Sequence, residues 1–341
     1  MADIDKLVEF GTPTFKMFMT YKKEGVMAPD ETLLKVFEKS KKVNGLPMLH
    51  CESNSIAELN IEKCIKDNDL SWVNFAKCKP VLCEAEAFDR AVNLAEYVGN
   101  AILIVHTTNE KSLNTARRAH ELGLPIYVET CPHYLTLFDN LYEGANGYLA
   151  ICSPPLRTEK EAEALWKGLS DGTILLTGSD DCTFDVDEKS MFLEKNEDGS
   201  WKQDFTKVVN GLSGLEIRLP ILLSEGVHKR GFSINQICAL TSTNIAKIYG
   251  CFPKKGIIAP GSDADIVIVD MDKEVVLSKD VLHNNISYCL HEGMKVKGYP
   301  IMTILRGKVI VENGEFKGTK YNGQFIKRKI STEYLKRYGL N

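Results

Sequence analysis

The sequence predicts an α/β fold, in which a TIM-type barrel of parallel strands and helices precedes a small β domain. Two observations lead to this prediction. Short apolar β-rich runs alternate with amphipathic helical segments over the first two thirds of the 341 residues, and the runs lack the polar alternation of a half-exposed sheet. Strands that are apolar on both faces are typical of a parallel sheet covered by helices.

The predicted strands and helices follow one another in regular order. The strands are residues 14–19, 46–51, 101–106, 126–131 and 174–178. A helix is expected to begin at Pro29, Asp30 and Glu31, with an acidic first turn, and to end before Gly45. Further helices are expected over 87–98, 112–122 and 243–249. So many short units favour a barrel over other parallel sheets.

The sequence pattern changes after the last of these helices, where short β-rich runs separated by turns replace the alternation of strands and helices. Residues 256–270 (GIIAPGSDADIVIVD) and 296–316 (VKGYPIMTILRGKVIVENGEF) are β-rich and contain Gly-Ser and Asn-Gly turn signals. We therefore expect a barrel domain over residues 1–255 and a small β domain with its tail over 256–341.

Composition excludes several classes of protein. The 42 basic and 46 acidic side chains give a net charge of −4 without basic blocks, so we expect neither nucleic acid nor membrane as a partner. The first residues lack the pattern of a secretory signal. The ten cysteines form no CxxC pair, which indicates free thiols and a cytoplasmic protein. Cys78 and Cys83, the closest pair in sequence, are interpreted as structural.

Four polar residues stand at or near the carboxyl ends of predicted strands, where barrel enzymes build their sites. Lys16 lies inside an apolar strand, His50 and His106 end two others, and Asp180 follows the fifth. Each alone has an ordinary structural explanation, such as a hydrogen-bonded core histidine or a helix cap. Two imidazoles, a carboxylate and a buried lysine that converge on one face together indicate a divalent metal site.

The sequence resembles the dihydropyrimidinase and hydantoinase branch of the cyclic amidohydrolases over essentially its whole length. The segments that carry the resemblance are FKMFMTYK (15–22), PMLHCES (47–53), ILIVHTTN (102–109), ETCPHYL (129–135), SPPLR (153–157), TGSDDCTF (177–184), NGLSGLEIRLP (210–220) and TSTNIAKIYG (241–250). The resemblance implies a hydrolase of pyrimidine catabolism that opens dihydropyrimidines such as dihydrouracil, or 5-substituted hydantoins, to N-carbamoyl amino acids. It also implies a homotetramer.

The resemblance assigns metal-binding roles to the same four residues. Lys16 matches a lysine that is carbamylated by CO2 and then bridges two zinc ions as a carboxylate. His50 and His106 match ligands of the second, more buried ion. Asp180 matches a ligand of the first ion that also shuttles a proton.

Three further residues match substrate-binding positions of the family. Tyr21 corresponds to the hydroxyl that polarises the amide carbonyl in the tetrahedral intermediate. Ser153 and Asn210 correspond to positions whose backbone groups hold the cyclic amide.

One feature of the family is missing. The first metal also needs an HxH pair on the first barrel strand, and none of the seven histidines forms such a pair. The resemblance therefore implies that the first three barrel strands, on the order of a hundred residues, and half of the small β domain are lacking. The expected fold is a partial (β/α)8 TIM-type barrel, with about five of its eight strands, plus part of a small β-sandwich domain. Alone, the chain is expected to bind at most one zinc ion, to be inactive, and to expose the edges of an open sheet, which favours poor solubility or association.

Two alternative functions remain open. The chain could be a non-catalytic relative that serves as a scaffold or assembly partner, although retention of the four ligand residues argues against this. It could also have another specificity within the amidohydrolases, such as that of an allantoinase, which substrate assays would separate.

Overall fold

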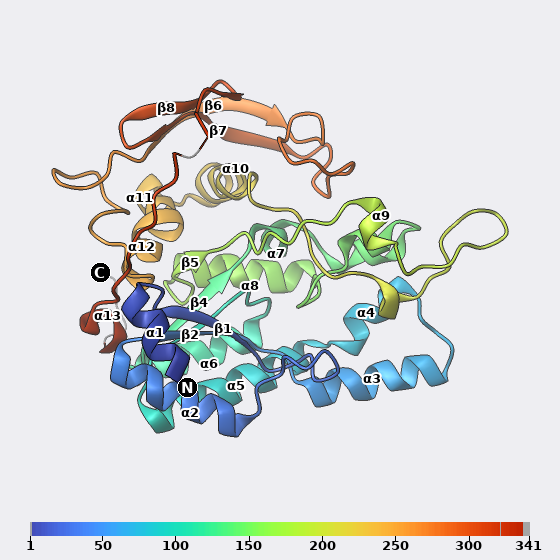
Figure 1. Ribbon diagram of the computed structural model, residues 1–341. Coiled ribbons are helices and arrows are strands. Elements are labelled where there is room, and N and C mark those ends of the chain that lie inside the picture. Colours follow the sequence, from blue (N-terminus) through green and yellow to red (C-terminus); the bar gives the residue numbers. More distant parts are fainter. Residues whose placement is uncertain (1, 321, 337–341) are drawn as a thin grey trace.

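Five parallel strands form the centre of the molecule in the computed structural model, which describes residues 2–320 and 322–336 (Figure 1). They are β1 (Thr14–Phe18), β2 (Leu46–His50), β3 (Ile102–Ile104), β4 (Ile126–Thr130) and β5 (Leu176–Thr177), arranged in this order. In the part of the chain described, the sheet does not close, and β1 and β5 are its outer strands. The predicted partial barrel with two open edges is confirmed.

The strands are shorter than predicted at their carboxyl ends. Residues 101–106 were expected to be extended, but β3 ends at Ile104 and His106 has a left-handed backbone with φ of 44°. Similarly, β5 ends at Thr177, and Asp180 has φ of 45°. This conformation is uncommon outside glycine and turns the chain out of the sheet. The candidate residues therefore sit on turns that begin where the strands stop.

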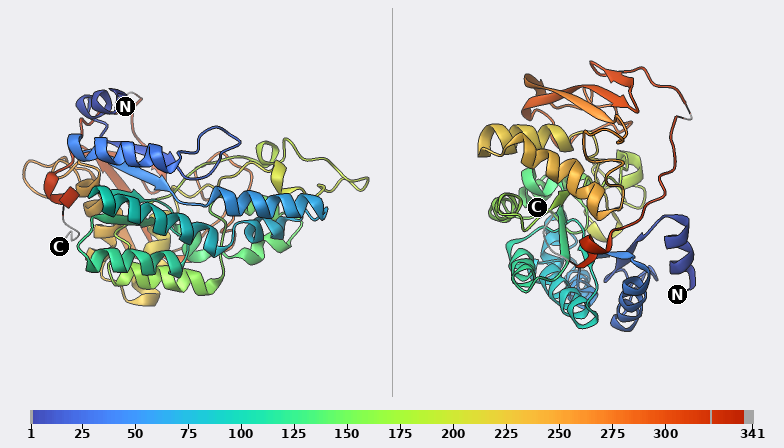
Figure 2. Two further views of the ribbon diagram at one scale, coloured as in Figure 1. Left: turned by 90° about the horizontal axis from the view of Figure 1, so that it is seen from below. Right: turned by 90° about the vertical axis from the view of Figure 1, so that its left-hand side faces the viewer.

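Helices cover one side of the sheet and lie next to one another in Figure 2. They are α2 (Asp30–Val43), α5 (Val81–Val98), α6 (Glu110–Glu121) and α8 (Glu159–Ser170). Helix α2 has the predicted acidic first turn and ends at Asn44, whose φ is 57°. Its Leu33 and Phe37 are fully buried and pack in one core cluster with Phe88 of α5. Apolar spacing on one helix face thus attaches each helix to the sheet.

Two helices extend from the carboxyl end of β2. They are α3 (Asn54–Lys66) and α4 (Trp72–Cys78). Their cysteines Cys64 and Cys78 meet with 3.3 Å between the Sγ atoms. Cys83, the nearest cysteine to Cys78 in sequence, instead donates to the Ser53 carbonyl. Proximity along the chain therefore did not identify the spatial pair.

Short helices lie between β4 and β5 and between β5 and the second sheet. The α-helices are α7 (Pro132–Thr136), α9 (Val186–Lys189), α10 (Arg218–Ile221), α11 (Ile234–Cys238) and α12 (Asn244–Ile248). Residues 222–229 and 239–243 are π-helical and continue α10 and α11, and short 3-10 turns lie at 139–143, 147–150 and 205–207. The predicted helix over 243–249 corresponds to α12.

The carboxyl-terminal region forms an antiparallel sheet beyond α10 and α11 (Figure 1). Its strands are β6 (Ile266–Val276), β7 (Lys295–Leu305), β8 (Lys308–Glu312) and β9 (Glu315–Phe316). Asn313 and Gly314 both have positive φ between β8 and β9, as a two-residue hairpin turn of the Asn-Gly type requires. The small β domain is thus present as one four-stranded sheet.

The tail returns from this sheet to the start of the barrel (Figure 2). The Arg328 amide donates to the Gly11 carbonyl (3.0 Å), and its guanidinium donates to Thr14 Oγ1 (3.0 Å). Phe325 stacks against Phe10 of α1 (Ala2–Phe10), and the described tail ends in α13 (Thr332–Lys336). The boundary at 255/256 stays a prediction. Among the described residues, no helix has both the length and the apolar character needed to cross a bilayer.

Candidate active site

His50 and His106 meet at the carboxyl edge of the parallel sheet. His50 is the last residue of β2, and His106 follows β3, its neighbour in the sheet. Their ring centroids lie 4.5 Å apart, and each residue is only 2% exposed. Burial lowers the pKa of both rings, so both are neutral and can act as ligands at neutral pH.

Lys16 reaches the same place from β1. Its Nζ lies 3.4 Å from Nε2 of His106. The residue was expected to be buried but is exposed, because β1 is an edge strand of the open sheet. The surrounding protein still shields the ammonium enough from water to lower its pKa, against the opposing charges of Asp180 and Glu129.

Asp180 follows β5 on the far side of the site. Partial withdrawal from water raises its pKa, while the charges of Lys16 and His50 oppose that rise, so the carboxyl group lies within electrostatic reach of both. The neighbouring Asp181 instead binds backbone amides of a loop. Its Oδ2 accepts from the backbone amides of Gly214 (2.9 Å) and Leu215 (3.0 Å) and fixes that loop.

A buried carboxylate orients His50. Nε2 of His50 lies 2.6 Å from Oε2 of Glu52, which is fully buried. Burial alone would raise the pKa of Glu52, but the Lys79 ammonium and the bond from His50 hold it at about 2. An ionised carboxylate only accepts hydrogen bonds, so Nε2 of His50 carries the proton and Nδ1 keeps a free electron pair. Sequence reasoning did not identify Glu52.

Tyr21 lies beside His50, and Ser153 joins this group of residues through Lys79. The Tyr21 ring centroid lies 5.5 Å from that of His50, and the Tyr21 backbone is left-handed with φ of 66°. Burial raises the pKa of its hydroxyl, which the Lys79 ammonium opposes, so the group stays protonated. Lys79 also donates to Oγ of Ser153 (2.7 Å).

Asn210 joins the site through the backbone. The amide of Gly211 donates to the carbonyl of Ile151 (3.1 Å), which ties the Asn210 segment to the segment that carries Ser153. Oδ1 of Asn210 is buried and has no hydrogen-bond partner in the described structure. No direct contact connects Asn210 with the histidines.

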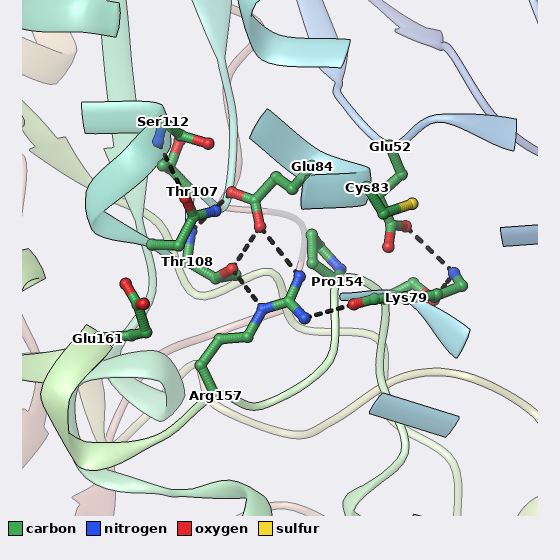
Figure 3. Close-up of polar contacts among 12 residues, drawn as sticks. Glu52, Lys79, Cys83, Glu84, Thr107, Thr108, Ser112, Pro154, Arg157 and Glu161 are labelled. Atoms are coloured by element: carbon green, nitrogen blue, oxygen red, sulfur yellow. Dashed lines mark hydrogen bonds and ion pairs between the residues drawn. The ribbon is translucent and has the colours of Figure 1, made fainter. Parts of the chain in front are cut away.

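A second buried ion pair braces the strand ends (Figure 3). Arg157 donates to Oγ1 of Thr108 (3.0 Å) and pairs with Glu84 (3.4 Å), and Glu84 accepts from the Thr108 amide (2.9 Å). Arg157 also donates to the backbone carbonyl of Lys79. Arg157 ends the SPPLR segment, which carries part of the family resemblance, but sequence reasoning did not identify its pairing with Glu84.

The donor set fits one divalent cation if Lys16 carries a carboxyl group. Within residues 2–320 and 322–336, no three His, Cys, Asp or Glu side chains are grouped closely enough to hold a metal ion unaided. The histidine pair offers Nδ1 of His50 and the ring of His106, and Lys16 lies beside them. As an ammonium Lys16 would repel a cation, whereas as a carbamate it would supply the missing anionic oxygens.

Comparison with known proteins identifies the family of this chain. Residues 4–310 match the model of the Amidohydrolase family. D-hydantoinases of Ralstonia pickettii and Geobacillus stearothermophilus are each 37% identical over 331 residues, which are 96% of this chain and 70% and 68% of theirs. Among solved structures, a D-hydantoinase has a TM-score of 0.91 at 36% identity, covering 98% of this chain and 70% of that one.

A dihydropyrimidinase from Brevibacillus agri has the same TM-score at 34% identity, over 96% of this chain and 70% of that one. The sequence matches and the shared arrangement of strands agree on one family. The chain therefore belongs to the amidohydrolase family, in its hydantoinase and dihydropyrimidinase branch.

Proposed function

We propose that this protein is a metal-dependent hydrolase that opens dihydropyrimidines or 5-substituted hydantoins to N-carbamoyl amino acids. Its class, a hydrolase acting on the C–N bonds of cyclic amides, follows from its relatives. The observation that carries the finer proposal is the meeting of Lys16, His50 and His106 at one sheet edge.

Lys16, His50 and His106 would hold one zinc ion, and Asp180 would contribute to a second. Lys16 must first react with CO2 as a neutral amine, and its lowered pKa enlarges that neutral fraction. When bound, the metal would acidify a water molecule and polarise the amide carbonyl.

The remaining steps belong to side chains of this chain. Asp180, whose pKa is raised, takes the proton of the attacking water and returns it to the leaving ring nitrogen. The protonated hydroxyl of Tyr21 donates to the developing oxyanion. Backbone groups of Ser153 and Asn210 would hold the ring of the substrate.

The test combines zinc content with a ring-opening assay in bicarbonate buffer, with dihydrouracil, hydantoin and allantoin as substrates. We expect at most one zinc per chain and negligible turnover from the 341 residues alone, because no HxH pair is present. Lys16→Ala should abolish zinc binding, whereas Lys42→Ala, an exposed lysine on α2, should leave it unchanged.

A fusion that adds the HxH-bearing segment of a D-hydantoinase should bind two zinc ions and open the ring. Lys16→Ala in that fusion should abolish both properties. Zinc binding that survives Lys16→Ala, or preference for allantoin, would contradict the proposal. Assembly into a homotetramer stays a prediction, which light scattering on the same samples can test.

A further inference from the structure

We infer that Lys79 is a positioning residue. It keeps the proposed metal ligand His50 and the proposed substrate-binding residue Ser153 correctly placed relative to each other. It binds the carboxylate that orients His50 and, with the same ammonium group, the hydroxyl of Ser153. This inference rests on the proposed function, because it concerns residues assigned to that site.

The ammonium lies where three parts of the chain converge. Nζ of Lys79 is 3.1 Å from Oε2 of Glu52, just beyond β2, and 2.7 Å from Oγ of Ser153. It also lies 5.4 Å from the centroid of the Tyr21 ring, beyond β1. The residue is only 6% exposed, so these contacts replace water around the charge.

The backbone of Lys79 is fixed independently of its side chain. Its carbonyl accepts from Arg157, which is itself paired with Glu84 (Figure 3). The preceding carbonyl, that of Cys78, accepts from the Asn60 side chain (3.2 Å). The backbone at Lys79 is therefore held in place, and the side chain carries its ammonium group from a fixed starting point.

Stability alone gives little reason for this arrangement. A buried ion pair gains little over apolar side chains of similar size, because both charges lose their hydration. Here the pair instead connects His50, through Glu52, with Ser153 and Tyr21. Without the tether, the Glu52 carboxylate would be held only by its own bond to Nε2 of His50, and Nδ1 would be held less firmly toward a cation.

The test measures the zinc affinity of the purified chain by competition with a chromogenic chelator, together with thermal melting. Lys79→Met should weaken zinc binding about 10- to 100-fold, the range typical for loss of a group that orients a metal ligand. Lys79→Arg, which keeps the charge and several donors, should restore affinity to within a few-fold. Lys77→Met, which changes an exposed lysine of α4 two residues before Lys79, should match the wild type.

A double variant separates positioning from simple support of the fold. Lys79→Met with Glu52→Gln removes both buried charges together, so no unpaired charge remains to prevent folding. Positioning predicts that the double variant melts near the wild type yet still binds zinc weakly, since an untethered neutral amide orients His50 poorly. Wild-type zinc affinity in the double variant, or in Lys79→Met itself, overturns the inference.

His50→Ala distinguishes failure of this inference from failure of the proposed function. If the wild type binds no zinc, or if His50→Ala binds it as tightly, the proposed metal centre is wrong and the inference falls with it. If His50→Ala loses zinc while Lys79→Met keeps it, only the role of Lys79 is refuted.

Discussion

Replacing Lys189 by methionine removes a charge that the fold keeps entirely out of water. Lys189, at the end of α9, is fully buried, and its Nζ donates to the carbonyls of Ile151 (2.9 Å) and Val209 (3.3 Å). Among the described residues no carboxylate pairs with it, and the nearby ionisable groups are the thiols of Cys152 and Cys182. The two carbonyls precede the segments that carry Ser153 and Asn210.

The magnitude follows from linkage between protonation and folding. Burial lowers the pKa of Lys189 from 10.5 to about 8. Between these values the unfolded chain binds the proton and the folded chain does not, so stability rises with pH. Summing both protonation states, this one group should raise the free energy of unfolding by roughly 2–3 kcal/mol between pH 7 and pH 10.

The assay is urea unfolding of the wild type and of Lys189→Met at pH 7, 8.5 and 10. Subtracting the free energy of unfolding of the variant cancels the groups that the two chains share. The remaining difference should grow by roughly 2–3 kcal/mol in favour of the wild type between pH 7 and pH 10. Lys167→Met, an exposed lysine on α8, should give a flat difference. If the difference in free energy of unfolding between the wild type and Lys189→Met stays constant or shrinks as the pH rises, the conclusion that Lys189 is buried with a lowered pKa is wrong.

Two further predictions concern the scaffold. Phe88→Ala should lower the free energy of unfolding by about 3–5 kcal/mol in urea titrations, because the ring is fully buried in the main core. Tyr97 lies on the same helix and is 82% exposed, so Tyr97→Ala should change the free energy of unfolding by no more than about 0.5 kcal/mol. Mild oxidation with diamide should join Cys64 to Cys78, whose sulfurs are in contact; peptide mapping that finds no such cross-link would show that the geometry of the pair forbids it.

Much of the fold could be predicted because it depends on local patterns. Apolar runs of five or six residues, separated by amphipathic helices, specify strands buried between layers and a parallel order. Polar residues at the ends of such runs necessarily meet at one edge of the sheet. His50, His106 and Lys16 were therefore predicted together, and their rings and ammonium do meet.

Strand ends were predicted less well. The backbones of His106 and Asp180 leave the extended region two or three residues beyond the last strand residue, and side-chain hydropathy does not report a left-handed turn. The exposure of Lys16 was also misjudged. An apolar strand looks the same in sequence whether a neighbouring strand covers it or not, and only the arrangement of the sheet makes β1 an edge.

The sequence by itself determined the order of strands and helices and the meeting of Lys16, His50 and His106 at one edge of the sheet, because both follow from periodicity along the chain. Only the tertiary structure revealed Glu52 and Lys79, and the pairing of Arg157 with Glu84. These contacts join residues from separate elements, 27 and 73 positions apart in the ion pairs, and no local pattern encodes which buried charge will face which. Burial explains why they must pair, since an isolated charge inside the fold would be too costly, but only packing decides the partner.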